Sequence, residues 1–424
     1  MQCGKLNAKI DSIDELLQQS NIKYALLFLV LFFSSGLSIG EFVVVKVLKY
    51  ILFTVTTVAV SLVMIKRGDL KEKLKGMNIL FVGIIILSLV SVVWSISRGV
   101  TLKSSIFLME TTIIAMYIGM YYSKKEIFEM LFIWFCGLIF INALLSLLHV
   151  PGTLDVQEMR YDNHPIKGIF KHRNLLGLYS VLGISISAWF YMNNKKEDRV
   201  RYVALISIVL GIILIYLAKS MTSMVLLPFM IILMIANRNR KVSNIIIYIT
   251  VPLLIFISYL IIAQPVFYVN LLESMGRNAT LTNRTVIWQG VIAGIQTRPF
   301  LGYGYSGFFT NNYIAVSFVA AHYGGFPSHC HNGFLELLID FGAIGATFII
   351  SMLIVALNKM RVLNKREILK DNRYLSYIIS FTVFILFFNL IESPIVKHFS
   401  TIYILIVIFF NILDKENKNS TIKE

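Results

Sequence analysis

The chain has 424 residues, of which 57% are hydrophobic and 15% charged, and its formal net charge at pH 7 is +16. Soluble globular domains contain about 45–50% apolar and about 25% charged residues. The composition therefore excludes a soluble protein and predicts one that crosses a membrane several times. The positive charge does not indicate a nucleic-acid partner, because the cytoplasmic loops of membrane proteins collect Lys and Arg.

Twelve runs of mostly apolar residues follow one another along the chain. A helix needs about 20 such residues to cross the hydrocarbon core of a bilayer, and most of the runs are close to that length. The sequence therefore predicts an all-α polytopic membrane protein with about 12 transmembrane helices. The runs cover residues 22–39, 41–65, 77–97, 104–122, 130–150, 174–192, 202–218, 220–236, 245–263, 336–357, 374–391 and 399–413.

The distribution of Lys and Arg predicts the orientation of these helices. With the N-terminus inside, the internal segments carry about twice as many Lys and Arg residues as the external ones, as the positive-inside rule requires. Both terminal tails, residues 1–21 and 414–424, are then cytoplasmic. Helices 1–9 occupy residues 22–263, helices 10–12 occupy residues 336–413, and residues 264–335 form a large external loop before the tenth helix.

The large loop contains an amphipathic helical pattern. Apolar residues recur at helical spacing from Ile287 to Ile295, Asn283 or Thr282 can cap the start, and Pro299 predicts the end. We expect this helix to lie at the external membrane surface. The following glycine-rich stretch, 302–307, matches G-x-G-x-x-G, but it lies in a loop and not between a strand and a helix, so it indicates turns and no dinucleotide site.

The external loops hold cations and histidines where the positive-inside rule predicts few. A lipid diphosphate would explain both, because Arg pairs with two phosphate oxygens at once and His can act as a base near neutral pH. Arg284 is the strongest candidate, since it opens a helix whose N-terminus attracts anions. The alternative is that these side chains are solvated cations near lipid headgroups. The residues are Arg160, His164, Lys167, Lys171, His172, Arg173, Arg277, Arg284, Arg298, His322, His329 and His331.

His329 and His331 flank one of the three cysteines, Cys330. Two histidines at this spacing, with no carboxylate and no second cluster nearby in the sequence, are a weak indication of zinc. We therefore expect no metal and no other cofactor.

Three short motifs occur in order between Arg160 and Gly345. The first combines Arg160 with Gly168, Phe170, Asn174 and Gly177, the second contains Asn283, Arg284, Trp288, Pro299, Gly302, Gly304 and Phe308, and the third is His331–Glu336 with Gly342 and Gly345. Together with twelve spans and the position of the large loop, they resemble the O-antigen ligase and Wzy-type polymerase superfamily. Arg173 stands where that family often has proline, which leaves open whether Arg160 or Arg173 is the diphosphate ligand of the first loop.

The resemblance implies a GT-C-like glycosyltransferase of the bacterial inner membrane. It would act on undecaprenyl-diphosphate-linked oligosaccharides at the external face, without nucleotide or metal. Arg160 and Arg284 would bind the diphosphate, and His331 would deprotonate or orient the acceptor hydroxyl, unless it only donates a hydrogen bond. The remaining expected site residues are Arg173, His172, Asn174 and Trp288, with Asn332 fixing the His331 ring and Glu336 holding its N–H.

Two functions share this chemistry. A polymerase would join lipid-linked repeat units into a surface polysaccharide, with a chain-length regulator as a further partner, whereas a ligase would move a finished glycan to lipid A-core. The sequence favours the polymerase, because nothing in the large loop marks a core acceptor. A transporter or flippase is disfavoured, since it would place charges and broken helices near the bilayer midplane, whereas most of the runs are free of charge.

Overall fold

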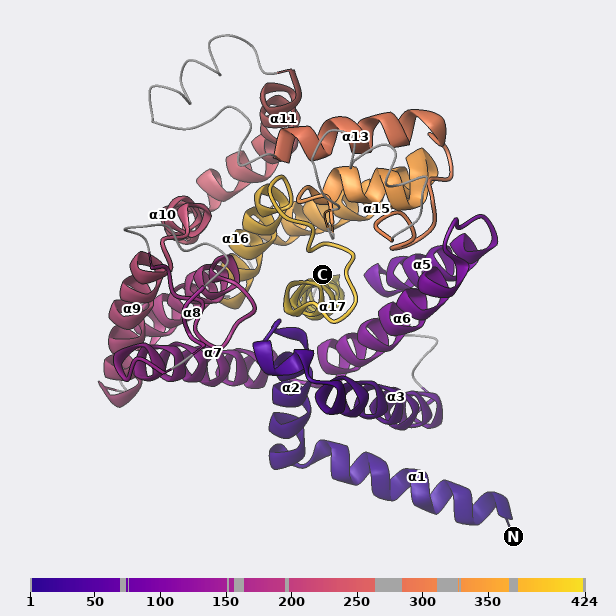
Figure 1. Ribbon diagram of the computed structural model, residues 1–424. Coiled ribbons are helices and arrows are strands. Elements are labelled where there is room, and N and C mark those ends of the chain that lie inside the picture. The colour runs from indigo at the N-terminus through magenta and orange to yellow at the C-terminus, as the bar shows by residue number, and fades with distance from the viewer. Residues whose placement is uncertain are drawn as a thin grey trace. The chain divides into compact units, whose positions relative to one another are not determined.

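Helices account for all the regular secondary structure in the described part of the chain (Figure 1). The computed structural model describes residues 2–68, 74, 76–150, 152–155, 164–194, 198–263, 284–310, 327, 329–365 and 373–421. Within these ranges two isolated β-bridges occur, Leu37 with Phe170 and Leu154 with Ile166, and no strand. The all-α fold class predicted from the sequence is confirmed.

Each of the twelve predicted runs overlaps one α-helix. Two helices are additional: α1 lies in the predicted N-terminal tail, and α13 corresponds to the predicted amphipathic helix. The helices are α1 (Gln2–Gln18), α2 (Ser20–Ser34), η1 (Ser38–Glu41), α3 (Val43–Lys66), α5 (Met77–Val90), η2 (Ser91–Val93), α6 (Arg98–Tyr121), α7 (Lys124–Leu147), α8 (Arg173–Asn193), α9 (Asp198–Ala218), α10 (Met221–Ala236), α11 (Arg240–Ala263), α13 (Arg284–Thr297), α15 (Gly333–Lys365), α16 (Arg373–Phe388) and α17 (Thr401–Thr421).

Seven helices of the described chain are long and apolar enough to cross a membrane, namely α3, α6, α7, α8, α9, α11 and α15. An eighth is obtained if Ile10–Gln18 and Ser20–Ser34, which are bent by 84°, form one broken span. Helices α5, α10 and α16 are apolar but shorter. The 16 residues of α10 extend about 24 Å, less than the ~30 Å hydrocarbon core of a bilayer. The predicted count of twelve spans is therefore not confirmed.

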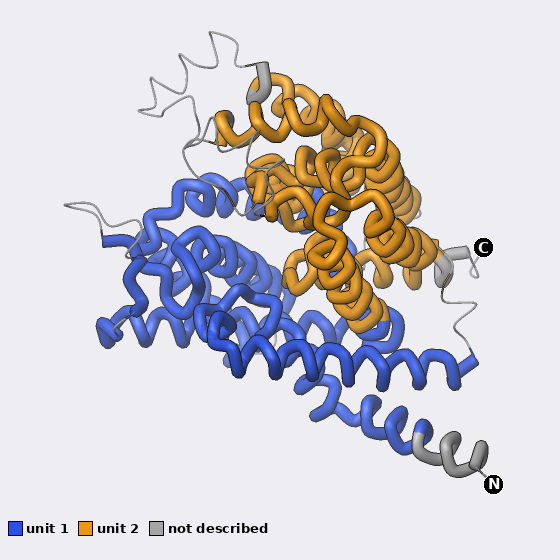
Figure 2. The backbone as a smooth tube through the Cα atoms, turned by 45° about the vertical axis from the view of Figure 1, so that its right-hand side comes forward, with its two compact units in different colours: residues 1–70, 117–238, 369–384 blue, residues 71–116, 239–368, 385–424 orange. Residues whose placement is uncertain are grey.

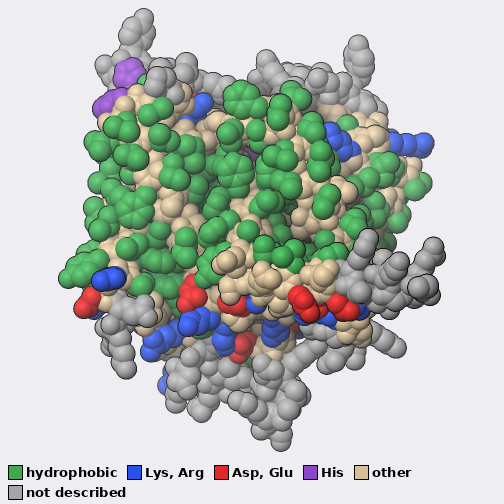
Figure 3. Space-filling view, turned by 90° about the horizontal axis from the view of Figure 1, so that it is seen from below, with side chains coloured by type: hydrophobic (Ala, Val, Ile, Leu, Met, Phe, Trp, Pro, Cys, Tyr) green, Lys and Arg blue, Asp and Glu red, His purple; other side chains and the backbone are tan. Residues whose placement is uncertain are grey.

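Helices α3, α9 and α11 expose apolar side chains along most of their length. In the most apolar 18-residue window of each helix, only 28%, 28% and 22% of the residues are buried. Figure 3 shows hydrophobic side chains over most of the visible face, with Asp and Glu side chains near its lower border and Lys and Arg side chains there and near its upper right border. An apolar surface of this extent is expected where lipid, and not water, is the solvent.

The chain divides into two compact units (Figure 2). Unit 1 comprises residues 1–70, 117–238 and 369–384, and unit 2 comprises residues 71–116, 239–368 and 385–424. In unit 1, α8 packs against α7, α9 and α10. Close approach of α8 and α10 depends on a glycine, because a Cβ atom on Gly177 would lie 2.2 Å from the Ser223 hydroxyl.

In unit 2, α15 packs against α5, α11, α13 and α17. This long helix is kinked at Gly342, whose φ of 65° lies in the left-handed region that glycine adopts without strain. A Cβ atom on Gly342 would lie 2.2 Å from the carbonyl group of Phe300. The turn that follows α13 therefore docks directly on the kink of α15.

The apolar face of α13 is buried within unit 2. Ile287, Trp288 and Val291 are at most 2% exposed and share a hydrophobic cluster with Phe308 and Ile339. The predicted helix and its end before Pro299 are confirmed. The apolar face that suggested contact with lipid is packed against protein. The position of α13 at the external membrane surface stays a prediction.

Candidate active site

The candidate site is built in unit 2, where the first turn of α13, the segment before α15 and the segment after α16 meet. Trp288 of α13 fixes the second of these segments, since its indole N–H donates to the carbonyl oxygen of Cys330 at 2.9 Å. Trp288 is 2% exposed. The sequence predicts that Trp288 binds substrate. The buried side chain instead holds in place the segment that carries His329 and His331.

The start of α15 is determined by Asn332 and Gly333. Asn332 caps the helix, because its side-chain oxygen accepts hydrogen bonds from the backbone N–H groups of Phe334 and Leu335, both at 3.1 Å. The expectation that Asn332 orients the His331 ring is thus replaced by a capping role. The N–H of Gly333 donates to the carbonyl oxygens of Asn389 at 2.8 Å and Glu392 at 3.1 Å.

Gly333 also lets the segment after α16 approach closely. A Cβ atom at this position would lie 1.9 Å from the side-chain oxygen of Asn389, so a larger residue cannot be accommodated without displacing that segment. The close approach brings Glu392 over the two histidines.

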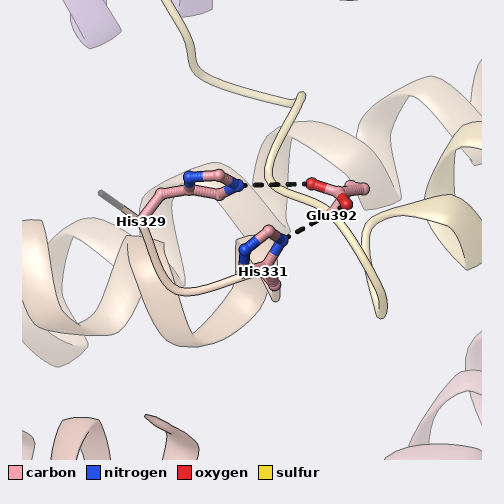
Figure 4. Close-up of side chains that lie close together, drawn as sticks. All are labelled: His329, His331 and Glu392. Atoms are coloured by element: carbon pink, nitrogen blue, oxygen red, sulfur yellow. Dashed lines mark hydrogen bonds and ion pairs between the residues drawn. The ribbon is translucent and has the colours of Figure 1, made fainter. Parts of the chain in front are cut away.

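His331 adopts a left-handed backbone conformation with φ of 54°. Such conformations are uncommon outside glycine, and they persist where the surrounding structure enforces them, often at functional sites. The ring nitrogen Nδ1 of His331 lies 3.3 Å from Oε1 of Glu392, and Nε2 of His329 lies 3.5 Å from Oε2 (Figure 4). The two imidazole rings face one carboxylate from the same side.

The expected partner of His331, Glu336, has another contact. Its Oε2 atom accepts a hydrogen bond from the N–H of Cys330 at 3.2 Å, which stabilises the backbone between the two histidines. Glu392 takes the place that the sequence assigned to Glu336. It was missed because it lies 61 residues from His331 in the sequence.

Arg284 joins the same cluster from the first turn of α13. Its Nη1 donates to the carbonyl oxygen of Ile391 at 2.7 Å, and its Nη2 donates to Oε1 of Glu392 at 3.2 Å. A guanidinium has five N–H donors, so three remain without a partner among the described residues. The side chain is 15% exposed, and Arg284 can both hold Glu392 and reach a bound anion.

The electrostatics of the cluster favour an ionised carboxylate at Glu392 and a neutral imidazole at His329. Burial alone would raise the pKa of Glu392, but hydrogen bonds from His329 and His331 and the charge of Arg284 hold that pKa below its ordinary value. Burial lowers the pKa of His329, which outweighs the opposing effect of Glu392. His329 is therefore neutral at pH 7.

This arrangement can perform proton transfer at His331. An ionised Glu392 accepts the Nδ1–H hydrogen bond and so favours the tautomer in which Nε2 carries a lone pair. Nε2 of His331 has no partner among the described residues, and the side chain is 29% exposed. A histidine oriented by a carboxylate in this way is the arrangement of a general base.

Three groups of the cluster could also hold a metal ion. One ligand atom from each of His329, His331 and Glu392 lies within 4.8 Å of the others. The sequence shows no carboxylate near the two histidines, but the fold brings Glu392 to them. The guanidinium of Arg284, however, already binds an oxygen of Glu392 and would repel a cation there, so the residues present fit an Arg–carboxylate–His network better than a metal centre.

The candidate residues of the first loop belong to unit 1. Nδ1 of His172 accepts a hydrogen bond from the N–H of Asn174 at 3.3 Å and caps α8, and the backbone N–H of Arg173 donates to Asp155 at 2.9 Å. The side-chain oxygen of Asn174 accepts a hydrogen bond from Ser220 at 3.1 Å. Arg160 lies outside the described residues.

Part of the first motif serves the fold of that loop. A Cβ atom on Gly168 would lie 1.8 Å from the side-chain oxygen of Asn142, and that oxygen accepts the N–H of Ile169 at 2.9 Å. Phe170 is fully buried and stacks on Tyr179. These contacts fix the loop on α7 and α8, and they position the start of α8.

The fold and the cluster together define a multi-pass helical membrane protein with a histidine, carboxylate and arginine site at the ends of its helices. Residues 206–350 match a family model described as O-antigen ligase, a range that includes Arg284 and His331 but ends before Glu392. The chain is also 30% identical over 91 residues to the exopolysaccharide production protein ExoQ of Rhizobium meliloti (strain 1021). That match covers 20% of this chain and 20% of ExoQ. The resemblance to the O-antigen ligase and polymerase superfamily is thereby confirmed.

Proposed function

We propose that this protein is a membrane glycosyltransferase that moves a glycan from undecaprenyl diphosphate to a sugar hydroxyl. The observation that carries the proposal is the pairing of His331 with Glu392 and Arg284, two of which lie in the segment that matches the O-antigen ligase family model. The cluster offers a base and a cation side by side, which are the two groups that this reaction requires.

In the proposed reaction, Nε2 of His331 takes the proton of the acceptor hydroxyl while its oxygen attacks the anomeric carbon of the donor. The bond from that carbon to the diphosphate oxygen breaks, and undecaprenyl diphosphate leaves with the electron pair. The free N–H donors of Arg284 and the first turn of α13 stabilise the departing charge. A positioned base contributes about 10²–10⁴-fold to such a rate. The mechanism routes no step through a metal or cofactor.

The acceptor distinguishes two candidate activities. We favour polymerisation of lipid-linked repeat units, for which the similarity to a protein named for exopolysaccharide production is the supporting observation. Ligation to lipid A-core is the second candidate, supported by the family description. Either activity would use lipid-linked oligosaccharide and membrane lipids as partners, and the polymerase would add a chain-length regulator. Either Arg160 or Arg173 is the proposed first-loop ligand of the diphosphate.

We further propose a GT-C-like arrangement of twelve spans in the inner membrane of a bacterium, with cytoplasmic termini and an external site. The Lys and Arg distribution supports this orientation. Topology reporters fused at Asn312 and at Lys365 should give opposite signals, the first external and the second cytoplasmic. Equal signals at the two positions would contradict the orientation.

The glycan pattern of a deletion strain tests the function. Loss of a polymerase should leave products that carry a single repeat unit, whereas loss of a ligase should leave lipid A-core without glycan. Loss of a flippase would block even single units from reaching the surface. Complementation with the wild-type gene should restore the pattern, and complementation with His331→Ala at equal membrane levels should not.

A further inference from the structure

A turn of unit 2, residues 298–301 directly after α13, presents apolar side chains at the surface. Phe300 is 69% exposed and Leu301 is 43% exposed. The indole N–H of Trp94, in the connection from α5 to α6, donates to the carbonyl oxygen of Leu301 at 2.8 Å. Val93, which precedes this tryptophan, is 70% exposed. Two neighbouring connections thus expose apolar groups together, as surfaces that contact a partner do.

The backbone of the turn is bonded to the kink of α15. In a continuous helix, the N–H groups of Ala343 and Ile344 would donate to the carbonyl oxygens four residues earlier. Beyond the kink at Gly342 they donate instead to the carbonyl oxygens of Pro299 and Phe300, at 2.7 and 3.3 Å. The turn therefore supplies acceptors for N–H groups that the kink separates from their helical partners.

The exchange also runs in the other direction. The carbonyl oxygens of Ile339 and Asp340, which lie before the kink, accept hydrogen bonds from the N–H groups of Tyr303 at 2.9 Å and Gly304 at 2.8 Å. Protein groups thus satisfy backbone donors and acceptors on both sides of the kink. Water could do the same for a kink in an aqueous loop, whereas a kink at membrane depth must find its partners within the protein.

The length of α15 places the kink at one boundary of the bilayer. Residues 343–365 of this helix extend about 34 Å, close to the ~30 Å of the hydrocarbon core. Ile344, Ile350 and Ile354 on this part of α15 are 57%, 44% and 45% exposed. Since the Phe300 carbonyl binds the N–H of Ile344, the turn adjoins the end of a helix whose exposed side chains are apolar.

Arginine and tryptophan side chains lie beside the apolar tip of the turn. Nη1 of Arg298 donates to the carbonyl oxygen of Trp94, and Nη2 of Arg98 donates to that of Val93, both at 3.3 Å. Both arginines are exposed. Tryptophan is enriched at the level of lipid headgroups, and arginine places its charge there while its stem contacts apolar surface.

We propose that the turn 298–301 and the adjoining connection from α5 to α6 insert into one leaflet of the bilayer as an apolar anchor. Phe300 would contact acyl chains, whereas Arg98, Arg298 and Trp94 would lie among the headgroups. The Lys and Arg distribution predicts that this leaflet is the external one. Because the anchor follows the last turn of α13, it would fix at the membrane one end of the helix that carries Arg284 at its other end.

The test uses the full-length protein in lipid nanodiscs, with a nitroxide spin label on one introduced cysteine at a time. Cys3→Ser is the background, because the other two native cysteines are buried. Molecular oxygen concentrates among acyl chains, whereas a nickel chelate stays in water. A label at Phe300→Cys should therefore collide with oxygen more often than with the chelate, as measured by power saturation.

Two positions on α15 calibrate the measurement. Ile354→Cys, halfway along the part of the helix beyond the kink, is the lipid reference. Lys365→Cys, an exposed position at the end of the helix, is the water reference. The ratio of oxygen to chelate collisions at position 300 should exceed the ratio at position 365 several-fold and approach that at position 354.

A ratio at position 300 that equals the water reference would overturn the proposal. Low collision rates with both reagents, together with dipolar broadening between labels, would also overturn it, in favour of contact with a second copy of the chain. Val93→Cys should give the same ratio as position 300 and keeps the test decisive if the label disturbs the turn. The readout is depth in the bilayer and not transfer, so a negative result leaves the proposed function intact.

Discussion

Replacement of Glu392 by glutamine tests whether the carboxylate makes His331 a base. Glutamine has nearly the same shape, so the docking of the segment on Gly333 is retained while the charge is lost. When His331 takes a proton, the wild-type carboxylate faces an imidazolium at 3.3 Å. At an effective dielectric constant of about 20 this attraction is about 5 kcal/mol. Part of it is screened, because the side chain of Glu392 is 22% exposed.

We expect the barrier to rise by about 3–5 kcal/mol, which corresponds to a roughly 10²–10⁴-fold lower kcat. KM should change little, because the interaction strengthens only as the proton moves. The assay is transfer in detergent from a synthetic lipid-diphosphate-linked glycan to a glycan acceptor, with product resolved by mass. Glu129→Gln is a matched control, since Glu129 pairs with Lys125 on the surface of α7.

A kcat for Glu392→Gln within a few-fold of the wild type would refute the base assignment. The same variant should also change how the free energy of unfolding depends on pH. The pKa of Glu392 is held below its ordinary value of 4.5, so its ionised form stabilises the fold above that pH, and the stabilisation is lost as pH falls through the lowered pKa. Below pH 4.5 the wild type should lose stability more steeply than the glutamine variant, as measured by chemical unfolding.

Three further substitutions probe neighbouring contacts. His331→Gln keeps a hydrogen-bond donor but no base and should abolish transfer, whereas His329→Gln should retain much of it; a full-length glycan ladder from His331→Gln would remove the base assignment. Arg284→Lys keeps the charge but loses the paired donors, so product should fall severely at normal membrane levels. Near-normal chains would leave Arg284 with only a structural role beside Glu392. Gly333→Ala should displace Asn389 and lower stability by about 1–3 kcal/mol in thermal unfolding, and an unchanged midpoint would contradict the close approach.

Local chemistry was sufficient to predict the helices and two members of the site. The apolar runs each became a helix, because burial of an apolar stripe is a property of neighbouring residues at fixed spacing. Arg284 and His331 of the candidate site could also be predicted, because their motifs consist of residues that are close in the sequence. The capping role of Asn332 was also readable, since an asparagine directly before an apolar helical run is a typical N-cap.

Glu392 could not be assigned by local reasoning. Its place over His331 follows from the docking of the segment after α16 on Gly333, which is a tertiary contact. One signal was available: Glu392 follows directly on an apolar run that ends on the same predicted side as His331. The packing of α13 against protein was also missed. An amphipathic pattern shows that one face of a helix is buried, but it does not show whether that face contacts protein or lipid.

The long separation between His331 and Glu392 has a consequence for biosynthesis. The carboxylate leaves the ribosome 61 residues after the histidine, which at about 5–20 residues per second is a delay of about 3–12 s. During this interval Arg284 and His331 of the nascent chain do not yet have the Glu392 carboxylate as a partner. Only when α16 has been inserted and the segment behind it has docked does the imidazole acquire its preferred tautomer. The proposed base and its carboxylate partner are therefore complete only late in translation, after every helix up to α16 has been synthesised.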